Sequence, residues 1–333
     1  MGHLLPLEKE LQIMRQTPIS MQYDGKEPLN VWQTRAREKL SELLGMEYFL
    51  PCDPCFAEES RTEYEDYTEI RFSFQSEENL FVPCVLWVPR VRRKNATAIC
   101  LQGHGRGMHV TLGIYKYPEE EAKKDGERDF AVQCMREGIC ALAMDQRNFG
   151  ERGGDPKPTC YIPSMDALLL GRTTIGGRVR DIQCAIDVLQ SAYAEYCADG
   201  IYCMGNSGGG TATIYAAALE ERISAAIPSC AFCTFADSIG SMHHCACNFV
   251  PNIRRYFDMA ELAGMIAPRP LVIVSGKEDD IFPLSGAVAE FARVRDIYYA
   301  ASEKPQNCVH VHGEGGHRFY AKPAWAALHH LLP

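Results

Sequence analysis

The sequence predicts a mainly parallel α/β sheet with helices packed on both of its faces. From Thr97 to the C-terminus, short apolar runs alternate with segments of helical pattern, which is typical of parallel strands joined by helices. Two earlier runs alternate apolar and polar residues, as antiparallel strands at a sheet edge do. At 333 residues the chain is long for one domain, but single α/β domains reach this size.

The elements follow in a regular order. A helix is expected at 30–45, where apolar side chains recur at helical spacing and Gly45 can end the helix. Edge strands are expected at 67–76 and 80–90, and helices around 119–138 and 178–193. The expected buried strands are 97–105, 140–146, 200–205, 223–230, 270–276 and 307–313.

Two departures from this pattern predict the domain organisation. Residues 1–60 are expected to form a helical N-terminal extension, and residues 61–333 the main α/β domain. Between about 231 and 266 the alternation of strands and helices stops. We therefore expect an insertion there, lying over one end of the sheet.

Composition excludes several classes of partner. The formal net charge of -9 argues against nucleic acid and against an anionic membrane surface. No apolar run reaches the roughly 18 residues that span a bilayer. The N-terminus does not resemble a secretory signal, so the 15 cysteines predict reduced thiols in a cytoplasmic protein. The expected partner is a small molecule, and the sequence favours no particular oligomeric state.

The segment Gly205-Asn206-Ser207-Gly208-Gly209 matches G-x-S-x-G between an apolar strand and an Ala-rich helix. Such a joint can cradle a phosphate or hold a serine hydroxyl as a nucleophile at the end of a sheet. A nucleophilic serine needs a base and an acid that orients the base, and in this architecture they follow in the order acid, then histidine.

Both partners follow at strand ends. Asp279 comes three residues after Gly276, although Glu278 and Asp280 are neighbours that compete for the role. His317 follows two glycines after the last strand, where an imidazole can reach over the sheet end. The predicted catalytic residues are therefore Ser207, Asp279 and His317.

The loop after the first central strand, LQGHGRG, is expected to contribute to an oxyanion hole. Its glycines allow the backbone to approach a substrate, and the N–H of His104 or Gly105 would act together with that of Gly208. Arg147, His243 and His244 are candidates for a substrate pocket, because they follow a strand end or belong to the insertion.

A metal site is not expected. Cys52 and Cys55 form a C-x-x-C pair, and residues 243–247 (HHCAC) add two histidines and two cysteines. A zinc site from these segments would need distant loops to meet, and neither has the spacing of a zinc finger. The sequence therefore predicts neither metal nor organic cofactor.

Together these segments resemble the α/β-hydrolases, and within them the acetyl-xylan-esterase-like and dienelactone-hydrolase-like esterases. The resemblance covers about residues 65–333. It implies Ser207 as nucleophile, Asp279 as acid and His317 as base, with N–H groups from His104 and Gly208, and ester hydrolysis without a cofactor. It rests on LQGHG (101–105), DQRNFGERGG (145–154), GNSGGG (205–210), PRPLVIVSGKEDDIFP (268–283) and GEGGHRF (313–319).

One departure concerns the substrate. The carbohydrate deacetylases of that group carry a glutamine after the nucleophile and an Arg-Gly-Gln-Gly loop, whereas this chain has Gly208 and the segment 147–150 (RNFG). The interpretation is a serine hydrolase of carboxylic esters with short acyl groups, carbohydrate esters among them. The alternatives are a serine peptidase of the oligopeptidase type and a non-catalytic nucleotide- or phosphate-binding protein.

Overall fold

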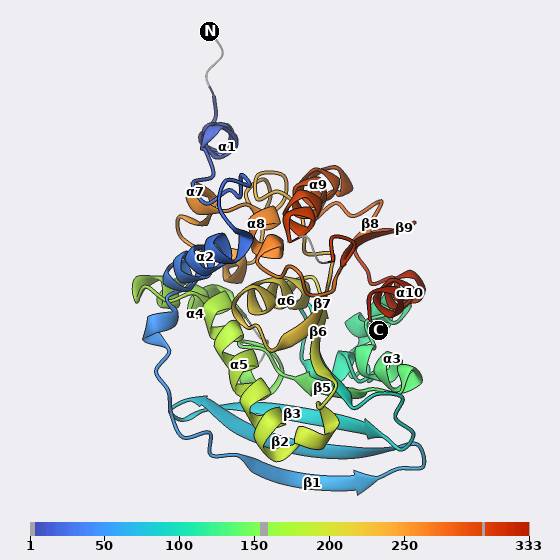
Figure 1. Cartoon of the computed structure of the whole chain (residues 1–333). Helices are drawn as coiled ribbons and strands as arrows, with labels where there is room; N and C mark the ends of the chain where they lie inside the picture. The colour runs from blue at the N-terminus through green and yellow to red at the C-terminus, as the bar shows by residue number, and fades with distance from the viewer. Residues whose placement is uncertain (1–3, 154–158, 302–303, 333) are drawn as a thin grey trace.

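The computed structural model describes residues 4–153, 159–301 and 304–332. Residues 1–3 of the predicted extension, Gly154 of the loop 145–154 and the C-terminal Pro333 lie outside the described residues. In the described segments, nine strands form one sheet in the order β1-β2-β3-β5-β4-β6-β7-β8-β9 (Figure 1). The strands are β1 (Ala57–Glu63), β2 (Tyr67–Glu77), β3 (Leu80–Pro89), β4 (Ala96–Leu101), β5 (Cys140–Met144), β6 (Gly200–Asn206), β7 (Ile223–Ser229), β8 (Leu271–Gly276) and β9 (Cys308–Gly313).

The sheet has an antiparallel part and a parallel part. β1, β2, β3 and β5 pair antiparallel, and β5, β4, β6, β7, β8 and β9 pair parallel. The carboxyl ends of the parallel strands therefore lie along one edge, where an open α/β sheet binds its ligands. The predicted fold class is confirmed.

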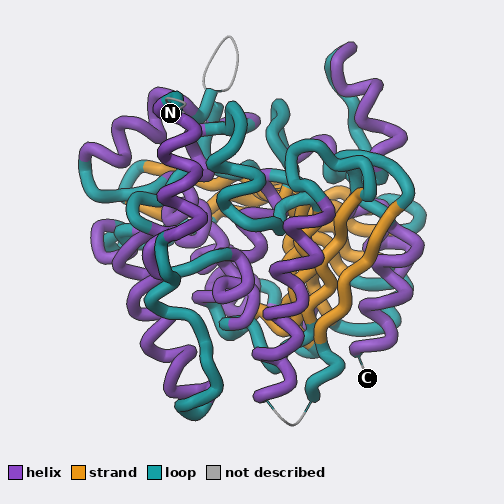
Figure 2. Tube along the Cα trace, turned by 90° about the horizontal axis from the view of Figure 1, so that it is seen from above, coloured by secondary structure: helices purple, strands orange, loops and turns teal. Residues whose placement is uncertain are grey.

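Helices cover both faces of the sheet, as the view from above shows (Figure 2). α5 and α6 pack together on one face with α8 and α9, whereas α3 and α10 cover the other face. The helices are α1 (Pro6–Gln16), α2 (Leu29–Leu44), α3 (Phe130–Glu137), α4 (Tyr161–Leu169), α5 (Thr174–Ala192), α6 (Gly208–Leu219), α7 (Ile253–Tyr256), α8 (Met259–Gly264), α9 (Leu284–Ala300) and α10 (Ala321–Leu331). None of the helices in the described segments is long and apolar enough to cross a membrane.

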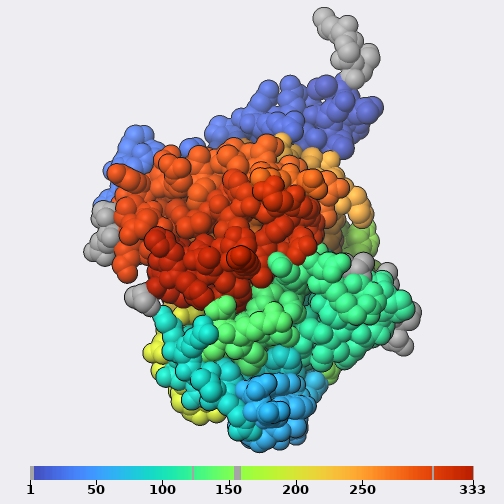
Figure 3. Space-filling model, turned by 90° about the vertical axis from the view of Figure 1, so that its right-hand side faces the viewer, coloured from blue at the N-terminus to red at the C-terminus, as the bar shows by residue number. Residues whose placement is uncertain are grey.

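The first two helices differ in how they meet the body. α1 buries no side chain, and it lies across the top of the molecule in Figure 3. α2 instead buries Trp32 and Leu40 in the main core, and the Gln33 side chain donates a hydrogen bond to Ala267 O at 2.7 Å. Gly45 ends α2 with φ of 69°, as its position in the sequence predicts.

Three elements differ from the expected ones. Strand β1 lies across residue 60, where we placed a helical extension. The expected helix at 119–138 is a 3₁₀ segment (Pro118–Gly126) followed by α3, because Glu127 has a left-handed φ of 49° that interrupts helical geometry. Helix α4 was not expected.

The stretch 231–266 has two parts. Between β7 and α7 the chain is mostly loop, with a single 3₁₀ turn at Ala246–Asn248. Helix α8 is buried throughout and packs against α9 and α6, so it belongs to the helical layer of the sheet. The loop part therefore carries the residues that can reach the sheet end.

Candidate active site

Ser207 stands at the sharp turn between β6 and α6. Its φ of 57° and ψ of −122° are rarely adopted by residues other than glycine. Such a conformation costs on the order of 1–3 kcal/mol, and it persists only where the surroundings hold it. Here the Ser207 N–H donates to Ser229 O at 2.8 Å, and Ser207 O accepts from the Thr211 N–H at 2.8 Å.

Two glycines allow this turn to pack closely on the end of β4. A Cβ at Gly209 would lie 2.2 Å from Leu101 O, and a Cβ at Gly103 would lie 2.8 Å from Asn206 O. No side chain fits at either distance. The loop after β4 therefore packs directly against the residues on either side of Ser207.

His317 and Asp279 form a buried pair in the loops after β9 and β8. His317 Nδ1 lies 2.9 Å from Asp279 Oδ2 and 3.1 Å from Oδ1. Asp279 Oδ1 also accepts from the N–H groups of Ile281 and Phe282 at 2.9 and 3.0 Å. The Phe282 ring stacks on the imidazole, with centroids 6.1 Å apart. Asp279, rather than Glu278 or Asp280, is thus the acid that contacts His317.

These contacts determine the charge of the acid. Burial alone would raise the pKa of Asp279, but the hydrogen bond and charge of His317 and the Phe282 N–H together lower that pKa below its ordinary value. Asp279 is therefore a carboxylate at neutral pH. It fixes His317 Nδ1 and leaves Nε2 as the nitrogen that can exchange a proton.

Ser229, at the end of β7, connects the Ser207 turn to the His317 loop. Its carbonyl accepts from the Ser207 N–H, and its hydroxyl oxygen lies 3.0 Å from Asn206 Oδ1 and 3.4 Å from Arg318 O, either of which can accept its one proton. The structure thus brings the predicted Ser207, Asp279 and His317 to one end of the sheet. Among the described residues no hydrogen bond joins the Ser207 hydroxyl to the His317 ring.

His104 and Gly208 meet next to Ser207. A Cβ at Gly208 would lie 2.8 Å from His104 Cε1, so the imidazole covers the first turn of α6. Within the described part of the chain, the N–H groups of His104 and Gly208 have no protein acceptor. Both N–H groups are therefore available to an oxyanion, where the helix N-terminus also favours negative charge.

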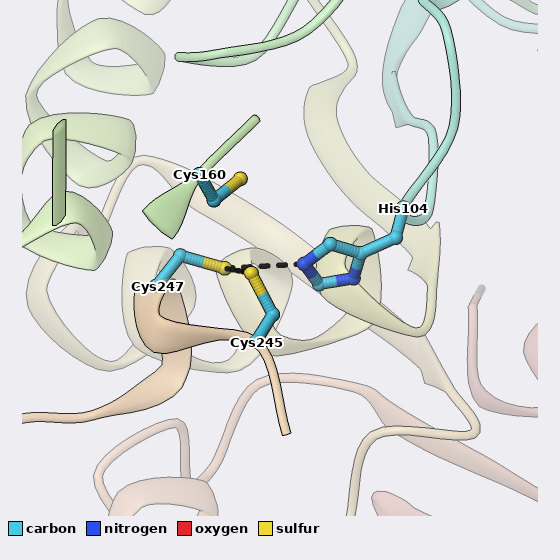
Figure 4. Close-up of side chains that lie close together, drawn as sticks. All are labelled: His104, Cys160, Cys245 and Cys247. Atoms are coloured by element: carbon cyan, nitrogen blue, oxygen red, sulfur yellow. Dashed lines mark hydrogen bonds between the residues drawn. The ribbon is translucent and has the colours of Figure 1, made fainter. Parts of the chain in front are cut away.

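The His104 side chain belongs to a second group, which we call the cysteine–histidine cluster: His104, Cys160, Cys245 and Cys247 (Figure 4). His104 Nε2 lies 3.2 Å from Cys247 Sγ, and Cys247 Sγ lies 3.2 Å from Cys245 Sγ. Hydrogen bonds from the Cys160 and Cys247 thiols lower the pKa of Cys245 far below its ordinary range. The predicted C-x-x-C pair, Cys52 and Cys55, does not take part in this cluster.

A cavity of about 500 Å³ opens beside the cluster. His243 and His244 lie in its wall, and His104 is shared between the cavity and the loop after β4. Arg106, in an ion pair with Glu119 at 2.7 Å, also lines it. The cavity therefore adjoins the Ser207 turn on the side of β4.

His244 links the cavity to the His317 pair. Its ring meets the Phe282 ring edge-on, and Phe282 in turn stacks on His317. His244 Nδ1 lies 2.9 Å from Asn248 Nδ2, while its buried Nε2 has no partner among the described residues. Burial, with the nearby His104 and His317, lowers the pKa of His244 to about 4, so the ring is neutral near pH 7.

Arg147, the third residue predicted for a substrate pocket, does not line this cavity. Its guanidinium pairs with Asp181 at 2.9 Å and with Glu77 at 2.5 Å, and Arg152 adds a second cation to Asp181. These charges lower the pKa of Asp181 to about 2 against the opposing effect of burial. Arg147 lines a separate hollow and stabilises the loop after β5.

Comparisons with solved structures agree with this architecture. A putative acetyl xylan esterase from Bacteroides fragilis superimposes with a TM-score of 0.77, covering 94% of this chain and 83% of that chain at 17% identity. A glucuronoyl esterase from Solibacter usitatus gives a TM-score of 0.67 over 96% of this chain and 98% of that chain at 15% identity. The protein has an α/β-hydrolase fold.

The sequence also has a curated relative. It is 29% identical over 185 residues to "Putative hydrolase YtaP" of Bacillus subtilis (strain 168), which is 55% of this chain and 60% of that relative's length. No protein-family model matches the chain. The comparisons thus show similarity to hydrolases, and to esterases in fold.

Two residues of the site had no sequence signal. Cys160 precedes α4, outside any spaced motif, and joins Cys245 and Cys247 only through the fold. Arg178, in the first half of α5, reads as one polar residue of an amphipathic helix, yet it is 1% exposed and contacts two of the cysteines.

Proposed function

We propose that the protein is a serine hydrolase of carboxylic esters that acts through an acyl-enzyme on Ser207. The observation that carries this proposal is the strained Ser207 turn at the same sheet end as a carboxylate-bound histidine. A phosphate cradle would need neither the strain nor the buried Asp279–His317 pair. Similarity in fold to esterases supports the same reaction class.

Each residue then has one chemical role. Ser207 Oγ attacks the ester carbonyl while His317 Nε2 takes the hydroxyl proton, and the same proton passes to the departing alkoxide. Asp279 keeps Nε2 as the basic nitrogen and stabilises the imidazolium. Water then attacks the acyl-enzyme with His317 again as base, which releases the acid and restores Ser207.

The oxyanion would be bound by the N–H groups of His104 and Gly208. Removing one such donor in an enzyme of this type costs roughly 3–4 kcal/mol of transition-state stabilisation. A proline substitution would be needed to remove the donor at His104, because the side chain is not the donor.

We infer an ester of a small, polar alcohol as the substrate. The adjoining cavity carries the Arg106–Glu119 ion pair and His243, which can bind hydroxyl groups. Fold neighbours named for acetyl xylan and glucuronoyl esters make a sugar ester a reasonable first substrate to test. The different residues at 147–150 leave the sugar and the acyl group to experiment.

The test compares p-nitrophenyl acetate, butyrate and octanoate with the wild type and Ser207→Ala. We expect the acetate or butyrate to be favoured and kcat to fall by roughly 10³-fold or more in the variant, because the nucleophile is gone. A fluorophosphonate probe should label the wild type and not the variant. Equal turnover by both proteins would contradict the role of Ser207, and turnover of peptides in place of esters would favour a peptidase.

A further inference from the structure

The cysteine–histidine cluster has the composition and spacing of a metal site. Three sulfur atoms and one imidazole nitrogen lie within 4.8 Å of one another. In tetrahedral zinc sites the metal lies about 2.3 Å from sulfur and about 2.0–2.1 Å from nitrogen. Ligand atoms around such an ion are neighbours at distances comparable with the 3.2 Å contacts of Cys247 to His104 and Cys245. Small side-chain rotations would thus complete a tetrahedron.

A buried arginine gives an independent indication that the cluster is negatively charged. Arg178 is 1% exposed, and its guanidinium donates to Cys247 Sγ at 3.4 Å, to Cys160 Sγ at 3.5 Å and to Arg147 O at 3.3 Å. Within residues 4–153, 159–301 and 304–332 it has no ion pair with a carboxylate, and its Nε has no partner. A buried cation without a counter-charge is costly. Neutral thiols would leave Arg178 without a counter-charge, with only the Phe149 ring, 4.9 Å from its Cζ, to stabilise the guanidinium.

Charge balance distinguishes the possible occupants. Three thiolates and one neutral imidazole around a divalent cation carry a net charge of −1, which the guanidinium of Arg178 neutralises. Sulfur with imidazole is a ligand set that suits zinc, whereas calcium and magnesium require oxygen ligands. Four protein ligands also leave no open coordination position, as in structural rather than catalytic zinc sites.

The position of the cluster suggests what an ion would do there. Its ligands come from three separate segments: the loop after β4, the start of α4 and the loop part of 231–266. Residues of the cluster line the cavity of about 500 Å³, which offers an ion a route from solvent. One ion would cross-link these segments and hold the His104 backbone beside Gly208.

We propose that His104 Nε2 and the thiolates of Cys160, Cys245 and Cys247 bind one zinc ion, with Arg178 as the buried counter-charge. The ion is structural and positions the loop after β4. Metal binding itself does not depend on the esterase proposal; only the expected effect on turnover does. This inference revises the expectation of no metal site, because Cys160 and His104 supply the ligands that the HHCAC segment lacks.

The first experiment measures metal content. Wild type, Cys245→Ser and Cys160→Ser are produced with added zinc, and zinc per chain is determined by inductively coupled plasma mass spectrometry. We expect about one zinc ion per wild-type chain and a several-fold lower content in both variants. Cys184→Ser is the matched control, because Cys184 is also buried and belongs to α5 outside the cluster. It should keep the wild-type content.

Equal zinc in all four proteins, or none in the wild type, would overturn the proposal. So would a disulfide between two cluster cysteines, which mass spectrometry of the non-reduced protein detects as a loss of two hydrogens. If the cysteine variants fail to fold, the test uses the wild type only. After a chelator has removed its metal, the wild type should bind one cobalt ion and show the absorption of tetrahedral, thiolate-bound cobalt. No such absorption would exclude the site.

Esterase assays on the same samples separate the two proposals. Zinc-loaded wild type without esterase activity would leave the metal site standing and overturn the proposed function. Wild type that hydrolyses esters but never contains metal would leave the proposed function standing and overturn the metal site.

Discussion

The two histidines of the site show how a partner decides what an imidazole can do. His317 is held at Nδ1 by the carboxylate of Asp279, and its Nε2 is left for proton exchange. His104 faces sulfur at Nε2 and packs on Gly208. In the proposed mechanism the carboxylate of Asp279 stabilises the imidazolium and so makes His317 the base. In the proposed zinc site Nε2 of His104 binds the metal, which leaves only the backbone N–H of His104 for a substrate.

The largest effect on activity is expected for a substitution of His317. His317→Gln should lower kcat for p-nitrophenyl acetate by roughly 10³-fold or more, because the proposed mechanism passes the Ser207 proton to His317. His312→Gln, an exposed position on the same strand-loop segment, should retain activity and serves as the control. A loss of less than tenfold in His317→Gln would mean that His317 is not the base.

The second prediction concerns the partner of the base. Asp279→Asn should lower kcat by about 10²- to 10⁴-fold, because an amide favours the wrong tautomer of His317. Asp280→Asn and Glu278→Gln are exposed neighbours and should stay near the wild-type rate. If one of these neighbours were instead the sensitive position, the contact between Asp279 and His317 would not be the functional one.

The comparison predicts a smaller effect on the His104 side. His104→Gln keeps the backbone N–H, so we expect at most about a tenfold fall in kcat for the acetate ester. The same variant should lose most of its zinc, as it lacks one of four proposed ligands. A fall as large as that of His317→Gln would assign the His104 ring a direct part in the reaction.

A third histidine, His244, extends the comparison to an imidazole that has an amide as its partner. His244 faces an amide, and burial lowers its pKa to about 4. The native state therefore favours the neutral ring, so stability should fall as pH drops from about 6.5, the unfolded value, towards 4. An NMR titration of histidine ring carbons, assigned with His244→Asn, should show a midpoint near 4. A midpoint near 6.5 would contradict the buried, neutral state.

Much of this site could be predicted from the sequence because its signals are local. The glycines around Ser207, the strand before them and the helix after them lie within one short segment, and parallel strands bring later strand ends to the same edge. Asp279 and His317 follow from that geometry. Their actual contact then selected Asp279 over its acidic neighbours.

Other features depend on contacts between residues far apart in the sequence, which no local sequence pattern predicts. Arg147 follows a strand end, as pocket residues often do, but Asp181 and Glu77 arrive from elsewhere in the chain and occupy its guanidinium. Cys160 meets Cys245 only because the start of α4 packs beside the loop 243–247. Strand β1 has no apolar alternation, since all seven of its residues are exposed.

That exposed strand has a consequence for how copies of the protein behave in concentrated solution. β1 is an edge strand of the sheet, and an apolar edge strand can pair with a strand of another chain. Instead β1 carries charged side chains in ion pairs: Glu59 with Arg71, Glu63 with Arg90, and Arg61 with Glu58. A second chain that docked there would have to strip water from this row of charges. The charged edge strand therefore protects the protein against aggregation through pairing of strands from different copies.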